Sequence, residues 1–223
     1  MDVHLIPGLG ADHRLFAKLR LPGHHLIAHD WPVMPKASTL ADFASALAAR
    51  VDAGRPHALV GVSMGGMVAQ ELAALTSPGR VVIISSWKGP HEMPAPIKAL
   101  RGTHPEKLLS RAFIQRTKPF LRWQMGADTP EDVALLDALL EVHTVAQLHV
   151  QVDAVLRWNG PPRPVPGLVH LHGDRDHLMP LGPIRDAVVV KGGGHLMVHT
   201  LAPTISALVQ RALAGEALSS GPA

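Results

Sequence analysis

The chain has 223 residues, of which 47% are hydrophobic and 17% are charged, so it is long enough to bury a core and too apolar to be disordered. It contains no cysteine, which excludes disulfides, thiolate nucleophiles and thiolate metal sites. The net charge is only +3 and aromatic residues make up 4%, whereas a nucleic-acid binder is expected to carry a basic face with interleaved aromatic residues. We therefore expect no nucleic acid among its partners.

The start of the chain lacks the basic segment and the long apolar run of a signal peptide. No apolar stretch approaches the roughly 20 residues that a membrane-spanning helix needs. From these two features we expect a cytoplasmic protein that does not bind a membrane.

Short apolar runs that end in glycine or a small polar residue alternate with stretches of helical periodicity. The expected strands cover residues 3–6, 25–28, 58–62, 81–84, 168–171 and 187–190, and the expected helices between or after them cover residues 40–53, 66–75 and 203–214. Continuous apolar strands suit a parallel sheet that is covered on both faces. The alternation therefore predicts an α/β fold, a mostly parallel sheet with helices on both faces.

One long interval, residues 87–166, contains no convincing strand. Helical signals fill it, among them Thr129 as an N-cap with Pro130 at the first helical position. We interpret the interval as a helical lid, with an ordinary helical packing layer as the alternative. The expected units are an α/β core formed by residues 1–86 and 167–214, the helical lid at residues 87–166 and a disordered tail at residues 215–223.

The strongest chemical signal is the motif Gly61-Val62-Ser63-Met64-Gly65, which follows an expected strand and opens an expected helix. Glycines two positions before and after the serine allow a sharp corner in which larger side chains would collide with the backbone. The corner places the Ser63 hydroxyl near a helix N-terminus, whose partial positive charge favours an anion. We therefore predict that Ser63 is a nucleophile, and the alternative is a glycine-rich turn with an idle serine.

A serine nucleophile needs a base and a group that orients the base, and two later stretches offer both. His172-Gly173-Asp174-Arg175-Asp176 follows one expected strand, and Lys191-Gly192-Gly193-Gly194-His195 follows the next. The order serine, acid, histidine is one of the known ways to build a catalytic triad.

With these motifs the chain resembles the α/β-hydrolase superfamily, over residues 3–213. The resemblance implies that Ser63 is the nucleophile and His195 the base. It also implies that Asp176 is the acid, because the family's HGxxD pattern places the acid four residues after its histidine. Asp174 is the competing candidate for this role.

The resemblance further implies an oxyanion hole made by the backbone amides of Met64 and Leu9. Many relatives begin the Leu9 loop with His-Gly, whereas Pro7 replaces the histidine here. The backbone donors remain, but the way in which the loop is braced differs. Because the sequence starts on the strand that leads into this loop, we expect a version of the fold with a minimal N-terminal part.

Two rival interpretations use the same segments. The pair Gly8-x-Gly10, with Asp30 ending the next strand, partly fits a dinucleotide-binding fingerprint, but the third glycine is missing and the triad residues stay unexplained. His195 and His199 have the spacing of zinc ligands on a helix, but no glutamate follows His195 as in H-E-x-x-H. We therefore expect neither a cofactor nor a metal site.

The chemistry expected from these residues is hydrolysis of a small carboxylic ester or thioester through an acyl-enzyme on Ser63, with a small acyl compound as the binding partner. One alternative is a hydrolase or lyase of C–C or C–X bonds, or a cofactor-free haloperoxidase, that uses the same three residues. Another alternative is a receptor-like binding protein with residual hydrolysis. Relatives that act on epoxides or haloalkanes are disfavoured because they need aspartate where Ser63 stands.

Candidates for an apolar substrate pocket are Trp87, Trp123, Trp158 and Met34.

Overall fold

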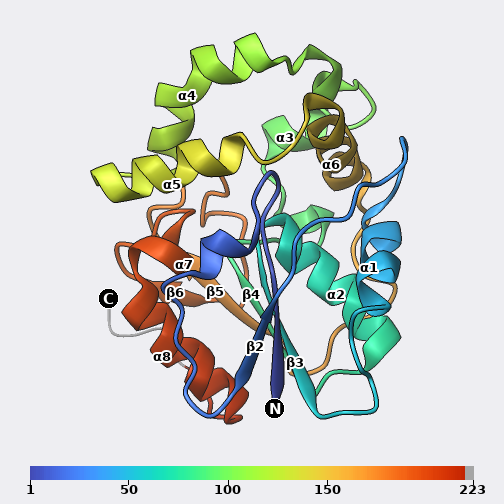
Figure 1. Cartoon of the computed structure of the whole chain (residues 1–223), viewed down its shortest axis with the longest axis vertical. Helices are drawn as coiled ribbons and strands as arrows, with labels where there is room; N and C mark the ends of the chain where they lie inside the picture. Colours follow the sequence, from blue (N-terminus) through green and yellow to red (C-terminus); the bar gives the residue numbers. More distant parts are fainter. Residues whose placement is uncertain (219–223) are drawn as a thin grey trace.

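The centre of the computed structural model, which describes residues 1–218, is a six-stranded sheet with the order β2-β1-β3-β4-β5-β6 (Figure 1). The strands are β1 (Asp2–Ile6), β2 (His25–Ala28), β3 (His57–Val62), β4 (Arg80–Ile84), β5 (Val169–Gly173) and β6 (Val188–Val190). Every neighbouring pair is parallel. This confirms the predicted α/β fold, because each expected strand forms and its ends differ by at most two residues from the prediction.

Helices cover both faces of the sheet, because alternate residues of each buried strand point to opposite sides. On β4, Val82 and Ile84 belong to one core cluster and Val81 and Ile83 to the other. The first cluster packs under the 3₁₀ helix η1 (His13–Phe16), α7 (Met197–Thr200) and α8 (Ala202–Leu213). The second cluster packs under α1 (Leu40–Ala48) and α2 (Met64–Thr76).

The first of the expected helices, 40–53, is shorter than predicted. It begins at a capping box in which Thr39 and Asp42 bond each other's backbone amides. It ends at Ala48, before Val51 and Asp52, which are weak helix formers. The Asp52 carboxylate instead accepts a hydrogen bond from the Gly54 amide and stabilises a turn.

Residues 87–166, called the cap below, form a helical layer between β4 and β5. The cap lies over the carboxyl edge of the sheet, at the top of Figure 1. Its elements are η2 (Pro90–Glu92), α3 (Ala95–Ala99), η3 (Pro105–Leu108), α4 (Arg111–Met125), α5 (Pro130–Leu140) and α6 (Val145–Arg157). Within residues 1–218, no single helix has the length and hydropathy of a membrane span, and α5 and α6 pass that test only as a pair bent by 97°.

The tail that was expected to be disordered is described only up to residue 218. Leu218 packs against the core, and Glu216 accepts a hydrogen bond from Arg211. Residues 219–223 lie outside the described residues.

Candidate active site

The corner between β3 and α2 holds Ser63 in a strained backbone conformation, with φ 54° and ψ −122°. A Cβ at Gly61 would collide with the carbonyl group of Gly65, and a Cβ at Gly65 would collide with the carbonyl oxygen of Ile6. The Ser86 hydroxyl stabilises the corner by donating to the Ser63 carbonyl oxygen at 2.7 Å. The two glycines are therefore required by the close approach of backbone segments, as the motif predicted.

The loops after β5 and β6 bring Asp176 and His195 together. A Cβ at Gly173 would collide with the Gly193 carbonyl, and the Arg175 amide donates to the same carbonyl oxygen at 2.9 Å, so glycine lets the two loops touch. The His195 Nδ1 lies 2.9 Å and 3.1 Å from the two carboxylate oxygens of Asp176. Because Nδ1 is used in this way, Nε2 is the imidazole nitrogen left for another partner.

The Asp176 carboxylate is completely buried and is held by several donors. Besides His195, the backbone amides of Met179 and Leu178 donate to it at 2.7 Å and 3.1 Å. Burial acts to raise the pKa of Asp176, but His195 and these hydrogen bonds outweigh it and hold the pKa below its ordinary value. The carboxylate is therefore ionised and keeps the imidazole oriented.

Asp174 has a different role. Its carboxylate accepts a hydrogen bond from the Gly192 amide at 2.7 Å at an exposed position. Of the two candidate acids, the structure places only Asp176 against His195, while Asp174 fixes the turn that leads into the glycine run.

Ser63 and His195 line one cavity of about 500 Å³ between the carboxyl edge of the sheet and the cap. No described residue makes a hydrogen bond with the Ser63 hydroxyl, and such contacts commonly tighten only when substrate binds. The cap contributes mainly apolar side chains from α4, α5 and α6. These include Ile114, Phe120, Leu121, Leu136, Leu139, Leu148 and Val152.

The backbone amides of Leu9 and Met64 are among those at the cavity that have no acceptor within the described residues. Met64 is the first residue of α2, so its amide belongs to the positive end of a helix. Leu9 follows β1 and lies in the loop beside Ser63, whose Cβ is 3.4 Å from the position of a Cβ built on Gly8. These are the two donors expected for an oxyanion hole, and both residues line the cavity that holds Ser63.

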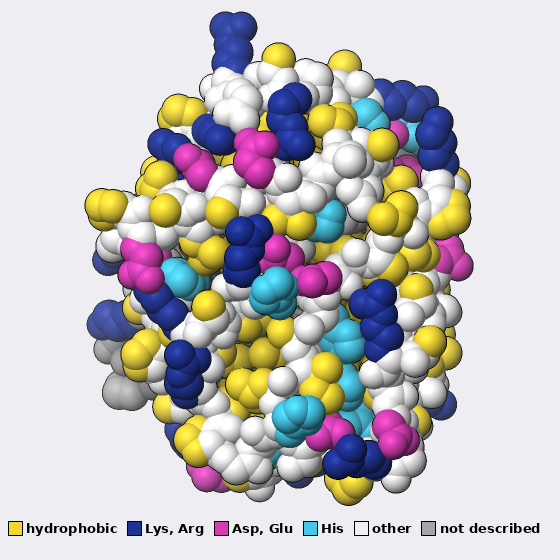
Figure 2. Space-filling model, viewed as in Figure 1, with side chains coloured by type: hydrophobic (Ala, Val, Ile, Leu, Met, Phe, Trp, Pro, Cys, Tyr) yellow, Lys and Arg dark blue, Asp and Glu magenta, His cyan; other side chains and the backbone are white. Residues whose placement is uncertain are grey.

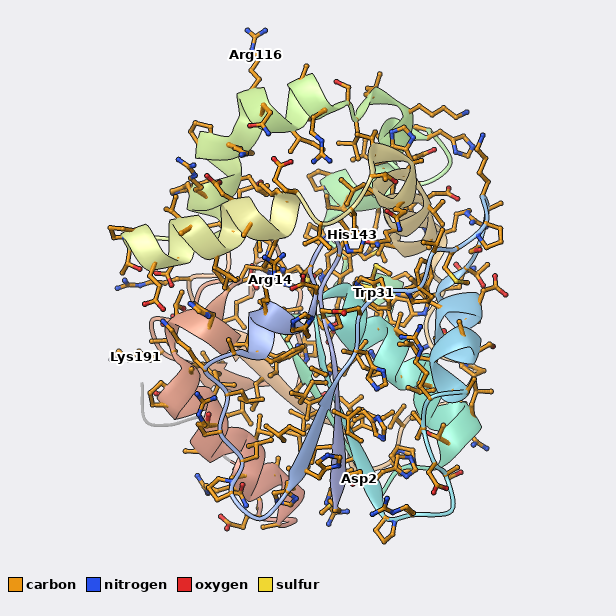
Figure 3. The ribbon with its side chains drawn as sticks, viewed as in Figure 1. Asp2, Arg14, Trp31, Arg116, His143 and Lys191 are labelled. Atoms are coloured by element: carbon orange, nitrogen blue, oxygen red, sulfur yellow. The ribbon has the colours of Figure 1, made fainter. Side chains whose placement is uncertain are left out.

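Three side chains brace the loop that carries Leu9. The indole of Trp31 donates to the Gly8 carbonyl oxygen at 2.8 Å, and the Gly10 amide donates to Gln151 Oε1 at 2.8 Å. His143 Nε2 contacts the Ala11 carbonyl oxygen at 3.3 Å. Trp31 comes from the core and His143 from the cap (Figure 3). The sequence did not indicate these braces, because they lie far apart in the chain and belong to no motif.

Of the four expected pocket residues, the structure brings only Trp87 to the cavity. Trp158 is buried elsewhere, because its indole donates to Glu71 Oε1 at 2.7 Å. Trp123 points to solvent and stacks on His177 with ring centroids 4.4 Å apart. Met34 packs against the core beneath α1 and α2. The apolar face of the cap helices supplies the wall that these side chains were expected to form.

Within the described residues, two groups of side chains have the geometry to hold a metal ion. They are Asp12-His13-Asp30 and His104-Glu106-Asp153. Neither group includes His195 or His199, the pair with zinc-like spacing, and none of their members lines the cavity.

A family model described as the alpha/beta hydrolase family matches residues 5–204. An esterase from Thermogutta terrifontis has a similar structure, with a TM-score of 0.75, 17% identity, and coverage of 96% of this chain and 90% of that one. An esterase from Exiguobacterium antarcticum gives a TM-score of 0.73 at 15% identity, covering 96% and 92% of the two chains. An epoxide hydrolase gives a TM-score of 0.70 at 13% identity, covering 96% of this chain and 91% of that one. No curated protein matches the sequence. At these identities the likenesses show the fold alone.

Proposed function

The chain belongs to the alpha/beta hydrolase family, and from this premise we propose that it is a serine hydrolase that cleaves a small carboxylic ester or thioester. The observation that carries the proposal is the buried hydrogen bond between Asp176 and His195, in the same cavity as Ser63 at its strained corner. An oriented base beside an activated serine is the arrangement that acyl transfer needs.

In the proposed first half of the reaction, the Ser63 hydroxyl attacks the substrate carbonyl carbon and its proton passes to His195 Nε2. Asp176 stabilises the imidazolium, because its carboxylate is ionised and bonded to Nδ1. The carbonyl oxygen becomes an oxyanion that accepts hydrogen bonds from Leu9 and Met64, each such donor contributing about 10²–10³ in rate. The bond to the leaving group then breaks, and His195 donates the proton to the departing alcohol or thiol.

In the second half, water takes the place of the leaving group. His195 accepts a proton from the water as its oxygen attacks the acyl-enzyme carbonyl, and the same two amides stabilise the second oxyanion. Collapse breaks the bond to Ser63 Oγ, which regains the proton from His195. The products are the free acid and the resting enzyme.

The lining of the cavity supports an apolar, uncharged substrate. Outside Ser63, His195 and the Leu9 loop, nearly all its walls are leucine, isoleucine, valine, methionine and phenylalanine side chains. An unpaired charge would have to be desolvated there without a compensating partner, which is costly. We therefore propose a hydrocarbon acyl or alcohol group as the part of the substrate that fills the cavity.

The first experiment measures hydrolysis of p-nitrophenyl esters of increasing acyl length by Ser63→Ala. We expect turnover to fall by about 10⁶-fold, as when a serine nucleophile is removed from a triad, with an unchanged circular dichroism spectrum. Labelling with a fluorophosphonate should be lost in the same variant. Rapid labelling of the parent enzyme without turnover of any ester or thioester would contradict ester hydrolysis and favour C–C or C–X bond chemistry.

The second experiment uses the two aspartates as a matched pair. Asp176→Asn should lower kcat by about 10⁴-fold, because asparagine favours the wrong tautomer of the imidazole. Asp174→Asn is the control and should retain most of the activity, since this side chain contacts Gly192 instead of His195. The reverse ranking would reassign the acid.

A further inference from the structure

Exposed large hydrophobic side chains are concentrated on one part of the cap. Of the ten in the described chain, five lie within residues 100–123. They are Leu100, Leu108, Phe113, Phe120 and Trp123, with exposed fractions of 39%, 76%, 47%, 57% and 56%. With Lys98, Lys107 and Arg116 they form what is called the outer cap face below. Its helix α4 is the outermost element of the molecule, at the top of Figure 1.

The part of the outer cap face that α4 contributes is a continuous stripe along this helix. Phe113, Arg116, Phe120 and Trp123 are spaced by three or four residues, so they lie on one side of the helix. The other side of α4 is already used, because Lys118 and Arg122 form ion pairs with Asp137 of α5. Figure 3 shows Arg116 pointing away from the protein. The stripe is thus left facing solvent.

The charge of this region is strongly positive. Residues 95–125 contain seven lysines and arginines and one acidic residue, whereas the whole chain carries only +3. Lys98, Lys107 and Arg116 are exposed and form no ion pair with a described residue. Dark blue and yellow side chains lie close together at this end of the molecule in Figure 2. The single acid, Glu106, is buried, and its Oε1 lies 3.1 Å from His104 Nδ1.

The outer cap face is also connected to the cavity. Phe113 and Phe120 line the cavity and are about half exposed, so its wall reaches the surface at these two side chains. A compound that suits the apolar interior is poorly soluble in water and partitions into lipid.

We propose that the outer cap face docks on the surface of an anionic lipid bilayer. Leu108, Phe120 and Trp123 enter the boundary between headgroups and acyl chains, and Lys98, Lys107 and Arg116 meet the lipid phosphates, as in interfacial amphipathic helices. Charge complementarity favours this occupant, because the outer cap face carries three cations that form no ion pair with a described residue, and the only acid within residues 95–125, Glu106, is buried. This docking does not depend on the proposed reaction. It would bring a lipophilic substrate to the cavity wall at Phe113 and Phe120.

Trp123 provides the first test. The other three tryptophans, Trp31, Trp87 and Trp158, are buried, so a change in emission on binding reports on Trp123. We expect a blue shift with phosphatidylcholine vesicles that contain phosphatidylglycerol, and quenching when the lipids carry bromine on their acyl chains. Vesicles of phosphatidylcholine alone should give a much smaller signal. Absence of a shift with anionic vesicles at low salt would overturn the proposal.

Charge variants provide the second test, by flotation with the same vesicles. Arg116→Glu should weaken binding by at least about 5-fold, the effect of a single basic residue near an anionic surface. Leu108→Ser should weaken it as well. Lys191→Glu is the matched control, with the same change of charge at an exposed position far from α4 (Figure 3), and should change binding by less than about 2-fold. If Arg116→Glu and Lys191→Glu lost vesicle binding equally, binding would depend only on the net charge of the protein. That result would overturn the proposal.

The third test separates docking from catalysis and from self-association. Arg116→Glu and Leu108→Ser should hydrolyse a short, soluble ester as the parent does, while losing rate on a long-chain ester embedded in anionic vesicles. Loss of activity on the soluble ester would point to damage of the cap instead of docking. Sedimentation should give a monomer at every concentration. A dimer that Leu108→Ser dissociates would mean that a second copy covers this face, contrary to the proposal.

Discussion

A buried pair of histidines, one in the middle of β1 and one directly after β2, makes stability depend on pH. His4 Nδ1 and His29 Nε2 are 2.9 Å apart, their rings are stacked, and both side chains are almost fully buried. Burial lowers the pKa of His29 to about 4, with additional contributions from His4 and Arg50 and an opposing one from Asp30. Protonation therefore requires a charge to be placed in the core beside another imidazole.

The magnitude follows from linkage between protonation and folding. The unfolded chain takes up a proton at this site near the ordinary pKa of 6.5, and the folded chain only near 4. Stability from neutral His29 is therefore fully present above pH 6.5, decreases as the pH falls below 6.5, and is lost once the pH has fallen through about 4. The difference corresponds to about 3 kcal/mol of unfolding free energy, a large share of the roughly 5–15 kcal/mol of a typical domain.

The test compares the parent with His29→Gln by urea unfolding between about pH 7.5 and pH 4.5, where most of this loss occurs. Glutamine retains a hydrogen-bonding group toward His4 but takes up no proton in this range. We expect the parent to lose roughly 2–3 kcal/mol more stability than the variant across the interval. His91→Gln, at an exposed position, is the control and should follow the parent. Parallel curves for the parent and His29→Gln would refute the reasoning.

Three further outcomes follow from contacts at the site. Gln151→Met removes the acceptor of the Gly10 amide, so steady-state kinetics should show kcat for a short ester lower by about 10-fold to 100-fold, approaching the loss of one oxyanion donor, with KM nearly unchanged. Gly65→Ala forces a methyl group against the carbonyl of the strand that precedes the Leu9 loop, so turnover should be lost and the melting temperature lowered. Trp158→Phe leaves Glu71 without its donor and should lower the urea-derived unfolding free energy by about 1–3 kcal/mol.

Each of these outcomes is checked by a control variant or by a result that would contradict it. Gly182→Ala introduces a methyl group into open space and should behave like the parent, in contrast to Gly65→Ala. An increase in KM without a change in kcat for Gln151→Met would indicate a role in substrate binding alone. Parent-like stability of Trp158→Phe would mean that water replaces the indole at Glu71.

The parts of the fold that local sequence determines were predictable. Apolar runs act through near neighbours, and the glycines around Ser63 belong to a motif with fixed local spacing, so both the strands and the corner at Ser63 could be identified. The choice between Asp174 and Asp176 depended on the path of two loops, which Gly173 and Gly193 allow to touch. The family pattern carried that choice, and the residues alone left it open.

The cavity wall and the outer cap face could not be predicted in the same way. A tryptophan in a loop or cap helix can face core, cavity or solvent, and hydrogen-bonding partners such as Glu71 for Trp158 decide which. Net charge is an average over the whole chain, and the small total conceals the basic stretch at residues 95–125. The expectation that the protein binds no membrane relied on the lack of a signal peptide and of a spanning segment, neither of which describes one exposed face.

The braces of the Leu9 loop affect how the cap and the core can evolve. Two of the three braces, Gln151 and His143, belong to the cap, while the loop belongs to the core. A chimera that takes its cap from another family member would lose both contacts unless the donor carries equivalents at the same places. Selection for a new pocket shape is therefore constrained at these two positions, and the cap and the loop must be inherited as one unit.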